Sequence, residues 1–295
     1  MKSFQNVPEI SIIIPVYNEA EGVEAVLRKL NDYLEQSHIS AEILAVDDGS
    51  SDATAEILAS LPLPFVRVIT HPINRGYGAA LKTGVHHAQG SYIAFYDGDG
   101  QHVPEELQMV LDKKDKFDMV VGARTGYKGP LWRQPGKRFI SALANYLVSF
   151  NIPDLNSGLR VVRKDVFQQF AHLYPNGFSL STTITLALIK EGFSVGYVPI
   201  TIKQRIGKST LKIRDGFATI SLVLRIIMLF APFRIFTPVS LVLFIFAGIS
   251  LIYDVLIAKN IGDNSLLFGI SALLIFLFGL LADQVAAVRR ELGAK

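Results

Sequence analysis

The sequence predicts an α/β domain built on a doubly wound, mainly parallel sheet, followed by a two-helix hairpin at the C-terminus. Three observations predict this fold class. Short apolar runs alternate with helical patterns up to about Val198, polar residues follow the apolar runs, and charged residues become rare from Phe217 onward. A globular domain joined to a membrane segment follows from this division.

Five apolar runs are expected to form strands, and the last of them ends in a cation. They are Ser11 to Val16, Glu42 to Asp48, Phe65 to Thr70, Tyr92 to Asp97 and Asp118 to Arg124. Helices are expected over Ala20 to Gln36, Thr54 to Leu61 and the stretch from Tyr77 to Ala88, whose apolar residues share one face. Ligands of such sheets lie beyond the carboxyl ends of the strands, where this sequence is rich in carboxylates.

Composition narrows the class of protein. The 295 residues are 50% hydrophobic and contain no cysteine, which excludes disulfides, thiolate metal sites and a cysteine nucleophile. The net charge of +3 is too small to indicate a nucleic-acid partner. The N-terminus has no apolar segment of the secretory kind, so the globular part is expected on the side of synthesis.

Two C-terminal stretches, about 236–257 and 265–284, are apolar enough to cross a bilayer, and a buried hydrophobic hairpin is the alternative. Basic residues flank this pair, so the positive-inside rule places both termini and the globular domain, residues 1–211, in the cytoplasm, at an inner or plasma membrane. Asp254 and Asp283 are expected to be solvated at the membrane interface.

Two further segments have amphipathic or apolar helical patterns. The first, near 137–150, is expected either to pack on the core or to lie in the membrane interface. The second, 212–233, is apolar on nearly all sides, and interfacial or buried placement is favoured over a spanning helix. Residues 234–295 then hold the hairpin and a short cytoplasmic tail.

The most informative motif is Asp97-Gly98-Asp99-Gly100-Gln101, directly after a predicted buried strand. Asp97, Asp99 and Gln101 offer hard oxygen ligands of the kind that Mg²⁺ or Mn²⁺ binds together with substrate phosphates. A solvated acidic turn is the alternative. A calcium loop of the EF-hand type is disfavoured, because Val103 to Leu107 supplies no further ligands at the required positions.

Two weaker candidates accompany this motif. Asp47-Asp48-Gly49-Ser50 ends another predicted strand and could accept hydrogen bonds from a nucleobase or ribose, although such sequences also form ordinary turns. Lys82 lies on the helix after Asn74-Arg75-Gly76, where it could face either a diphosphate or solvent.

The segments IIIPVYNE, VDDGSSDAT, NRGYGAAL and DGDGQHVPEEL occur together and in this order. This set resembles the family 2 glycosyltransferases, and among them dolichyl-phosphate mannose synthase and its bacterial polyprenyl-phosphate relatives. The resemblance implies a GT-A, Rossmann-like fold. It also implies that Asp97, Asp99 and Gln101 bind the metal and the donor diphosphate and that Gly98 lies at the donor. The other residues that it places at the nucleotide-sugar are Pro15, Tyr17, Glu19, Val46 and Asp47, with Asp48 and Lys82 as the candidates named above.

The segment Asp154-Leu155-Asn156-Ser157-Gly158-Leu159-Arg160 resembles the acceptor-side loop of the same family, while the ED pair and Q-x-x-R-W motif of processive polysaccharide synthases do not occur. A lipid phosphate is already an anion and needs no general base, but it needs positive charge. The candidate cations are Arg124, Arg138 and Arg205, and the hydroxyls of Ser141 and Ser209 are further candidates for contact with the acceptor phosphate. The segment Arg205 to Thr210 departs from the R-x-x-G-x-S-K pattern of relatives, which puts the roles of Arg205 and Lys208 in doubt.

The expected activity is inverting transfer of one hexose-type sugar to a polyprenyl phosphate, dolichyl or undecaprenyl, catalysed with Mg²⁺ or Mn²⁺. GDP-mannose, UDP-glucose and UDP-N-acetylglucosamine remain alternatives for the donor, and copies of the chain could associate through the hairpin. Two rivals stay open. One is a membrane-anchored family 2 transferase that acts on a glycan or diacylglycerol hydroxyl, and the other is a nucleotide-binding scaffold without catalysis.

Overall fold

The computed structural model describes residues 7–125, 134–148, 150–177, 179–201, 225 and 227–291. The chain divides into two compact units. The first comprises residues 1–141 and 150–213, and the second comprises 142–149 and 214–295. The predicted boundary at residue 211 lies outside the described residues and stays a prediction, as do the structures of Arg205 and Ser209.

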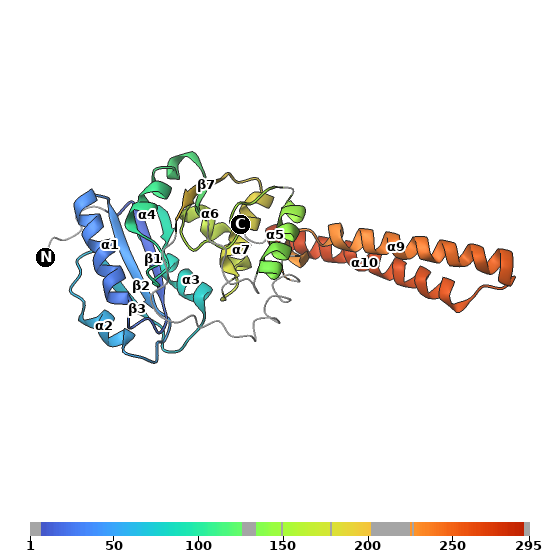
Figure 1. Ribbon diagram of the computed structural model, residues 1–295, viewed down its shortest axis with the longest axis horizontal. Coiled ribbons are helices and arrows are strands. Elements are labelled where there is room, and N and C mark those ends of the chain that lie inside the picture. Colours follow the sequence, from blue (N-terminus) through green and yellow to red (C-terminus); the bar gives the residue numbers. More distant parts are fainter. Residues whose placement is uncertain are drawn as a thin grey trace. The chain divides into compact units, whose positions relative to one another are not determined.

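The first unit is built on a seven-stranded sheet with the order β3-β2-β1-β4-β6-β5-β7. Figure 1 labels β1, β2, β3 and β7 of this sheet. The strands are β1 (Ile10–Val16), β2 (Ala41–Asp47), β3 (Val66–Thr70), β4 (Tyr92–Phe95), β5 (Met119–Arg124), β6 (Arg160–Arg163) and β7 (Val195–Ile200). β6 runs antiparallel to both of its neighbours, and the other pairs are parallel. The predicted mainly parallel sheet is therefore confirmed.

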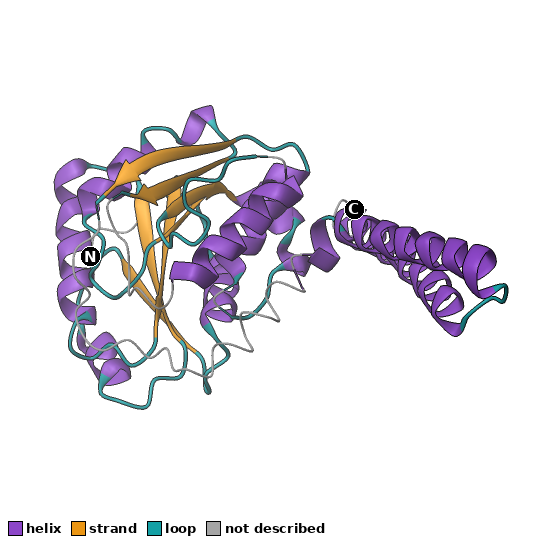
Figure 2. Cartoon of the chain, turned by 45° about the vertical axis from the view of Figure 1, so that its right-hand side comes forward, coloured by secondary structure: helices purple, strands orange, loops and turns teal. Residues whose placement is uncertain are grey.

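Helices connect these strands, and most of them pack against the sheet (Figure 2). They are α1 (Val23–Ser37), α2 (Thr54–Ser60), α3 (Tyr77–His87), α4 (Pro104–Leu111), η1 (Lys114–Lys116), α5 (Gln134–Val148), α6 (Lys164–Gln169), η3 (Ala171–Leu173) and α7 (Leu180–Lys190). The five predicted strands and the first three predicted helices are all present, with ends shifted by at most a few residues. α5 begins a few residues before the predicted amphipathic segment.

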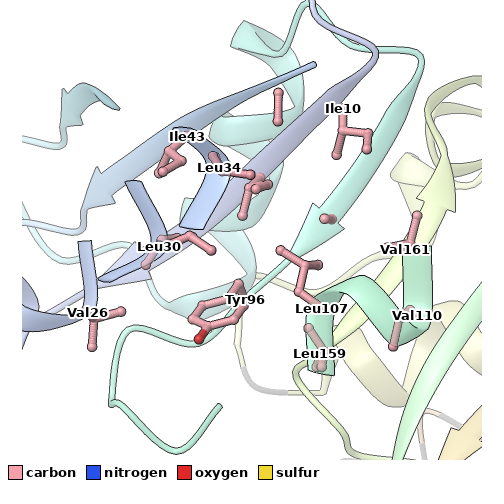
Figure 3. Close-up of a cluster of buried hydrophobic side chains, with 14 of the residues drawn as sticks. Ile10, Val26, Leu30, Leu34, Ile43, Tyr96, Leu107, Val110, Leu159 and Val161 are labelled. Atoms are coloured by element: carbon pink, nitrogen blue, oxygen red, sulfur yellow. The ribbon is translucent and has the colours of Figure 1, made fainter. Parts of the chain in front are cut away.

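Alternation along the central strands sends side chains to both faces of the sheet. Ile12 and Ile14 point to the face covered by α1 and α4, where a cluster of buried side chains forms the main core (Figure 3). Ile13 points to the opposite face, where the backbone of Gly84 on α3 lies so close that a β-carbon there would come within 2.4 Å of the Ile13 side chain. Because both faces are covered, the open positions for a ligand are at the strand ends.

The second unit contains α9 (Pro232–Tyr253), a short π-helix η4 (Asp254–Ala258) and α10 (Asp263–Glu291). α9 and α10 are long and apolar enough to cross a membrane, as the sequence predicts. The expectation that Asp254 is solvated is wrong. It is 8% exposed, and its carboxylate accepts hydrogen bonds from the Gly262 amide at 2.8 Å and from the Ser265 hydroxyl, so it connects the end of α9 to the segment where α10 begins.

Candidate active site

The loops that follow β1 and β2 are joined by hydrogen bonds. The Asn18 amide donates to Ser50 Oγ at 3.0 Å, the Ser51 amide donates to Asn18 Oδ1 at 2.8 Å, and the Glu19 amide donates to Thr54 Oγ1 at 3.0 Å. Asn18 has a φ of 53°, which asparagine tolerates better than most residues. Parallel pairing of the two strands and these contacts bring the predicted donor-binding residues of both loops to one edge of the sheet.

Asp47, the last residue of β2, has one satisfied and one unsatisfied carboxylate oxygen. Oδ1 accepts hydrogen bonds from the amide and the hydroxyl of Ser50, at 3.0 and 2.6 Å. Oδ2 is buried and accepts no hydrogen bond from the described part of the chain. A buried carboxylate oxygen without a donor is costly, so this atom is suited to accept a hydrogen bond from a ligand.

Asp48 has a different environment. Its carboxylate accepts hydrogen bonds from the amides of Arg75 and Gly76, at 2.9 and 2.7 Å, and lies 2.7 Å from His71 Nδ1. Gly76 has a φ of 98°, a conformation that favours glycine. Asp48 thus fixes the turn that leads into α3, and its predicted contact with the nucleotide stays a prediction.

Lys82 on α3 is directed toward a neighbouring loop. Its ammonium group donates to the Tyr174 carbonyl at 3.2 Å and to Asn176 Oδ1 at 2.5 Å. The Asn176 carbonyl in turn accepts from the Ala79 amide at 3.1 Å, so the loop is attached to the start of α3. The structure therefore gives Lys82 a structural partner, and its role toward a diphosphate is untested.

The other predicted donor residues differ in exposure. Pro15 and Glu19 are half-buried and Tyr17 is 37% exposed, so all three are accessible at the strand ends. Val46 is fully buried in β2. Only its backbone could therefore line a ligand, and the prediction for Val46 holds at most for main-chain atoms.

The predicted metal loop follows β4 as a tight turn. Gly98 is buried, Asp97, Asp99 and Gln101 are half-buried, and the Gln101 amide donates to Asp99 Oδ1 at 3.1 Å. Gly100 has a φ of 74°, which lets the chain turn between the two predicted ligands. No group of three or more His, Cys, Asp or Glu side chains forms a metal cluster among the described residues. Two carboxylates and one amide oxygen nevertheless fit a hard divalent cation that takes its remaining ligands from water and phosphate.

Asp97 is held from two sides. The Tyr77 hydroxyl donates to Asp97 Oδ1 at 2.9 Å, and Oδ2 lies against the backbone of Gly158. Burial, and then the charge of Asp97, raises the pKa of Tyr77 well above its ordinary value, so the phenol remains a donor. Arg160 is fully buried close to Tyr77 and Asp97, and desolvation lowers the pKa of its guanidinium.

Tyr77, Gly158 and Arg160 were not predicted as site residues. The sequence contains signals for all three, because Tyr77 follows the Asn-Arg-Gly turn and the other two belong to the loop Asp154 to Arg160. What the sequence does not contain is the contact between these two segments and Asp97.

Arg124 forms a bidentate ion pair with Asp154, 30 residues further along the chain. Its Nε and Nη2 donate to the two carboxylate oxygens at 2.6 and 2.9 Å, and its backbone amide donates at 3.2 Å. Burial opposes ionisation of Asp154, but the hydrogen bonds and charge of Arg124 outweigh it and hold the pKa of Asp154 below its ordinary value. The predicted phosphate-binding role of Arg124 therefore concerns a cation that already has an anionic partner.

This pair makes stability depend on pH in the acid range. Because the folded-state pKa of Asp154 lies below the ordinary value of about 3.9, its contribution is complete above that value and is lost as pH falls through the folded-state pKa. Asp154→Asn should cost about 1.5–3 kcal/mol of unfolding free energy at pH 7, and this difference should shrink below about pH 4.

Unfolding of the detergent-solubilised protein between pH 3 and pH 7 measures the effect. Asp165→Asn is the matched control, because the Arg163–Asp165 pair is largely exposed and should contribute little at any pH. A stability difference for Asp154→Asn that stays constant over this range contradicts the account.

Two predicted acceptor residues lie on α5. Arg138 is exposed and Ser141 is half-buried. Arg205 and Ser209 lie outside the described residues. The structure therefore does not test the proposed grouping of cations around an acceptor phosphate, which stays a prediction.

Comparison with known proteins identifies the family to which this chain belongs. The model of glycosyl transferase family 2 matches residues 11–170, which include the strand ends described above. The chain belongs to glycosyl transferase family 2. A second model, the GtrB C-terminal hairpin, matches residues 231–288 and thus both apolar helices. The match and the helices indicate a membrane-anchored glycosyltransferase.

Two curated proteins of known activity are similar to this chain in sequence. Polyprenol monophosphomannose synthase of Mycolicibacterium smegmatis is 33% identical over 208 residues, 66% of this chain and 77% of the relative. Undecaprenyl-phosphate 4-deoxy-4-formamido-L-arabinose transferase of Edwardsiella ictaluri is 30% identical over 178 residues, 59% of this chain. The match spans only 55%, about half, of the latter protein's length.

Solved structures confirm the GT-A fold. Mannosyl-3-phosphoglycerate synthase from Rubrobacter xylanophilus has a TM-score of 0.60 at 19% identity, over 75% of this chain and 72% of the other. Glucosyl-3-phosphoglycerate synthase from Mycobacterium tuberculosis, solved with Mn²⁺, UDP-glucose and phosphoglyceric acid, has a TM-score of 0.60 at 15% identity, over 75% and 79%. At these identities the likeness concerns the fold alone.

Proposed function

We propose that this chain transfers one sugar from a nucleotide-sugar to the phosphate of a polyprenyl phosphate, with the catalytic domain on the cytoplasmic side of the membrane. One observation supports this above all: a family 2 domain with an acidic site is followed in the same chain by the GtrB-type hairpin. The relatives of E. ictaluri and M. smegmatis are named for polyprenyl-linked products or acceptors, which agrees with this assignment.

The donor is expected at the ends of β1, β2 and β4. The buried Oδ2 of Asp47 would accept a hydrogen bond from the base or ribose, and Asp97, Asp99 and Gln101 would hold Mg²⁺ or Mn²⁺. When bound there, the cation supplies positive charge that stabilises the departing nucleoside diphosphate. A neighbour of the same fold was solved with Mn²⁺ and UDP-glucose, which supports this class of donor.

The reaction needs no general base from the chain. An oxygen of the lipid phosphate, already negatively charged, forms a bond to the anomeric carbon. The bond from that carbon to the diphosphate oxygen breaks on the opposite face, and its electron pair leaves with the nucleoside diphosphate. The anomeric configuration is thereby inverted. Arg138 is the exposed cation best suited to steady the lipid phosphate, whereas Arg124 would have to do so while paired with Asp154.

The acceptor is expected to arrive along α5. Phe139 and Tyr146, seven residues apart on this helix, are 61% and 53% exposed, which favours membrane-interface placement over packing on the core. Within the second unit, Arg234 at the start of α9 donates to the Tyr146 carbonyl at 2.6 Å, and the Tyr146 hydroxyl donates to the Arg234 carbonyl at 3.2 Å. Tyr146 is thus attached to the entry of a helix of spanning length.

Purified protein incubated with Mn²⁺, labelled nucleotide-sugars and either polyprenyl phosphate or diacylglycerol tests the proposal. We expect label in the polyprenyl phosphate alone, with one of GDP-mannose, UDP-glucose and UDP-N-acetylglucosamine preferred. Label in diacylglycerol alone would make the chain a hydroxyl transferase. No label with any donor would leave only the non-catalytic scaffold.

The unsatisfied oxygen of Asp47 gives a second prediction. Asp47→Asn keeps an acceptor for Ser50 but removes the charge and replaces one acceptor by a donor. Nucleotide affinity should fall by about 10- to 100-fold, the equivalent of a hydrogen bond to a charged group, while thermal stability should not fall. Calorimetric titration with UDP and GDP measures this, and unchanged affinity would remove Asp47 from the donor site.

A further inference from the structure

The Tyr77 phenol and the backbone of Gly158 fix the carboxylate of Asp97 from two directions. Tyr77 begins α3, and its hydroxyl donates to Oδ1 at 2.9 Å. On the other side, a β-carbon built on Gly158 would come within 1.9 Å of Oδ2. Segments far apart in the sequence therefore meet at the first carboxylate after β4.

Tyr77 is itself held by a buried cation through one intermediate residue. Ser181 at the start of α7 makes a side-chain hydrogen bond to the Tyr77 phenol, and the Ser181 carbonyl accepts from Arg160 Nη1 at 2.9 Å. Arg160 is fully buried and also donates to the Ser157 carbonyl and, at 3.1 Å, to Thr185 Oγ1. A continuous set of hydrogen bonds thus runs from Arg160 to Asp97.

We infer that Tyr77 is a positioning residue that orients the Asp97 carboxylate for the metal-bound donor, with Arg160 and Ser181 as its anchor. The inference deepens the proposed function and rests on it. An ionised carboxylate has about four lone-pair positions, so the bond to Tyr77 leaves acceptor capacity for a cation while it removes rotational freedom. Partners behind a metal ligand typically contribute about 10- to 100-fold to metal affinity or activity.

The test uses full-length protein in detergent and measures binding without any lipid acceptor. Mn²⁺ is titrated in the presence of UDP or GDP, and free Mn²⁺ is followed by electron paramagnetic resonance. Tyr77→Phe removes only the hydroxyl, and we expect the affinity for Mn²⁺ with nucleotide to fall by about 10- to 100-fold. Binding of nucleotide alone should change much less.

Tyr174→Phe is the matched control. Tyr174 is also buried and close enough to Arg160 for the charge of the guanidinium to act on it, but its hydroxyl has no hydrogen-bond partner among the residues described. We expect this variant to bind Mn²⁺ and nucleotide as the unaltered protein does. Ser181→Ala, which keeps the Ser181 carbonyl for Arg160, should weaken binding by a smaller factor and provides the test should Tyr77→Phe not fold.

The outcomes separate this inference from the proposed function. Unchanged Mn²⁺ affinity in folded Tyr77→Phe overturns the positioning role and leaves the transferase proposal intact. Equal losses in Tyr77→Phe and Tyr174→Phe also overturn it, because they indicate a general disturbance of the core. If the unaltered protein itself does not bind Mn²⁺ with UDP or GDP, the donor site of the proposed function is wrong.

Discussion

Asp99→Ala should reduce sugar transfer by on the order of 10³-fold, because the loss of a metal ligand removes several kcal/mol of charge stabilisation from the transition state. Asp99 is half-buried in the turn after β4, and Oδ1 also accepts the Gln101 amide at 3.1 Å. The replacement therefore also removes a hydrogen bond that holds the backbone at Gln101.

The measurement is the rate of label transfer at saturating nucleotide-sugar over a series of Mn²⁺ concentrations. Asp112→Asn, which changes an exposed carboxylate at the end of α4, is the control and should retain the original rate. A rate for Asp99→Ala within a few-fold of the original would exclude Asp99 as a metal ligand.

Gly158→Ala should reduce transfer by about 100-fold or more, since displacement of a reacting group by about 1 Å can have an effect of this size. The added methyl group would come within 1.9 Å of Asp97 Oδ2 and 2.5 Å of its Cγ. Asp97 has little room to yield, because Tyr77 holds its other oxygen. The unfolding free energy should also fall by about 1–3 kcal/mol.

Gly177→Ala is the matched control for this prediction. A β-carbon on Gly177 meets no atom within 4 Å, so the same chemical change should leave both stability and rate close to their original values. If Gly158→Ala retains full activity and Mn²⁺ binding, the close contact between the loop Asp154 to Arg160 and Asp97 has no functional importance.

The sequence predicted the parallel part of the fold because local patterns encode it. The runs that became β1, β2 and β4 are continuous and apolar, as strands covered on both faces must be, and each is followed by polar residues. The carboxylates Asp47, Asp97 and Asp99 could be placed at one edge for this reason. β6, only four residues long and bounded by Arg160 and Arg163, has no such pattern, and its antiparallel pairing could not be read locally.

The partners of the charged side chains could not be predicted from the sequence, for a related reason. Arg124 looked like an available cation at the end of a strand, but Asp154 neutralises it from 30 residues away. The sequence suggested that Asp48 contacts the nucleotide, but both of its carboxylate oxygens accept hydrogen bonds from backbone amides of the turn before α3. Arg160 lies in a recognisable motif, but only the tertiary structure shows that its charge is buried behind Tyr77 and Asp97. Such pairings depend on which segments the fold brings together.

The central claim is that the sugar becomes attached to the lipid phosphate. Phosphorus NMR of the lipid recovered after reaction with nucleotide-sugar labelled with ¹³C at the anomeric carbon tests it most directly. We predict that the phosphate monoester signal is replaced by a phosphodiester signal coupled to that carbon, in the configuration opposite to the donor's. A phosphorus signal that stays a monoester while label enters a hydroxyl-bearing lipid would contradict the claim.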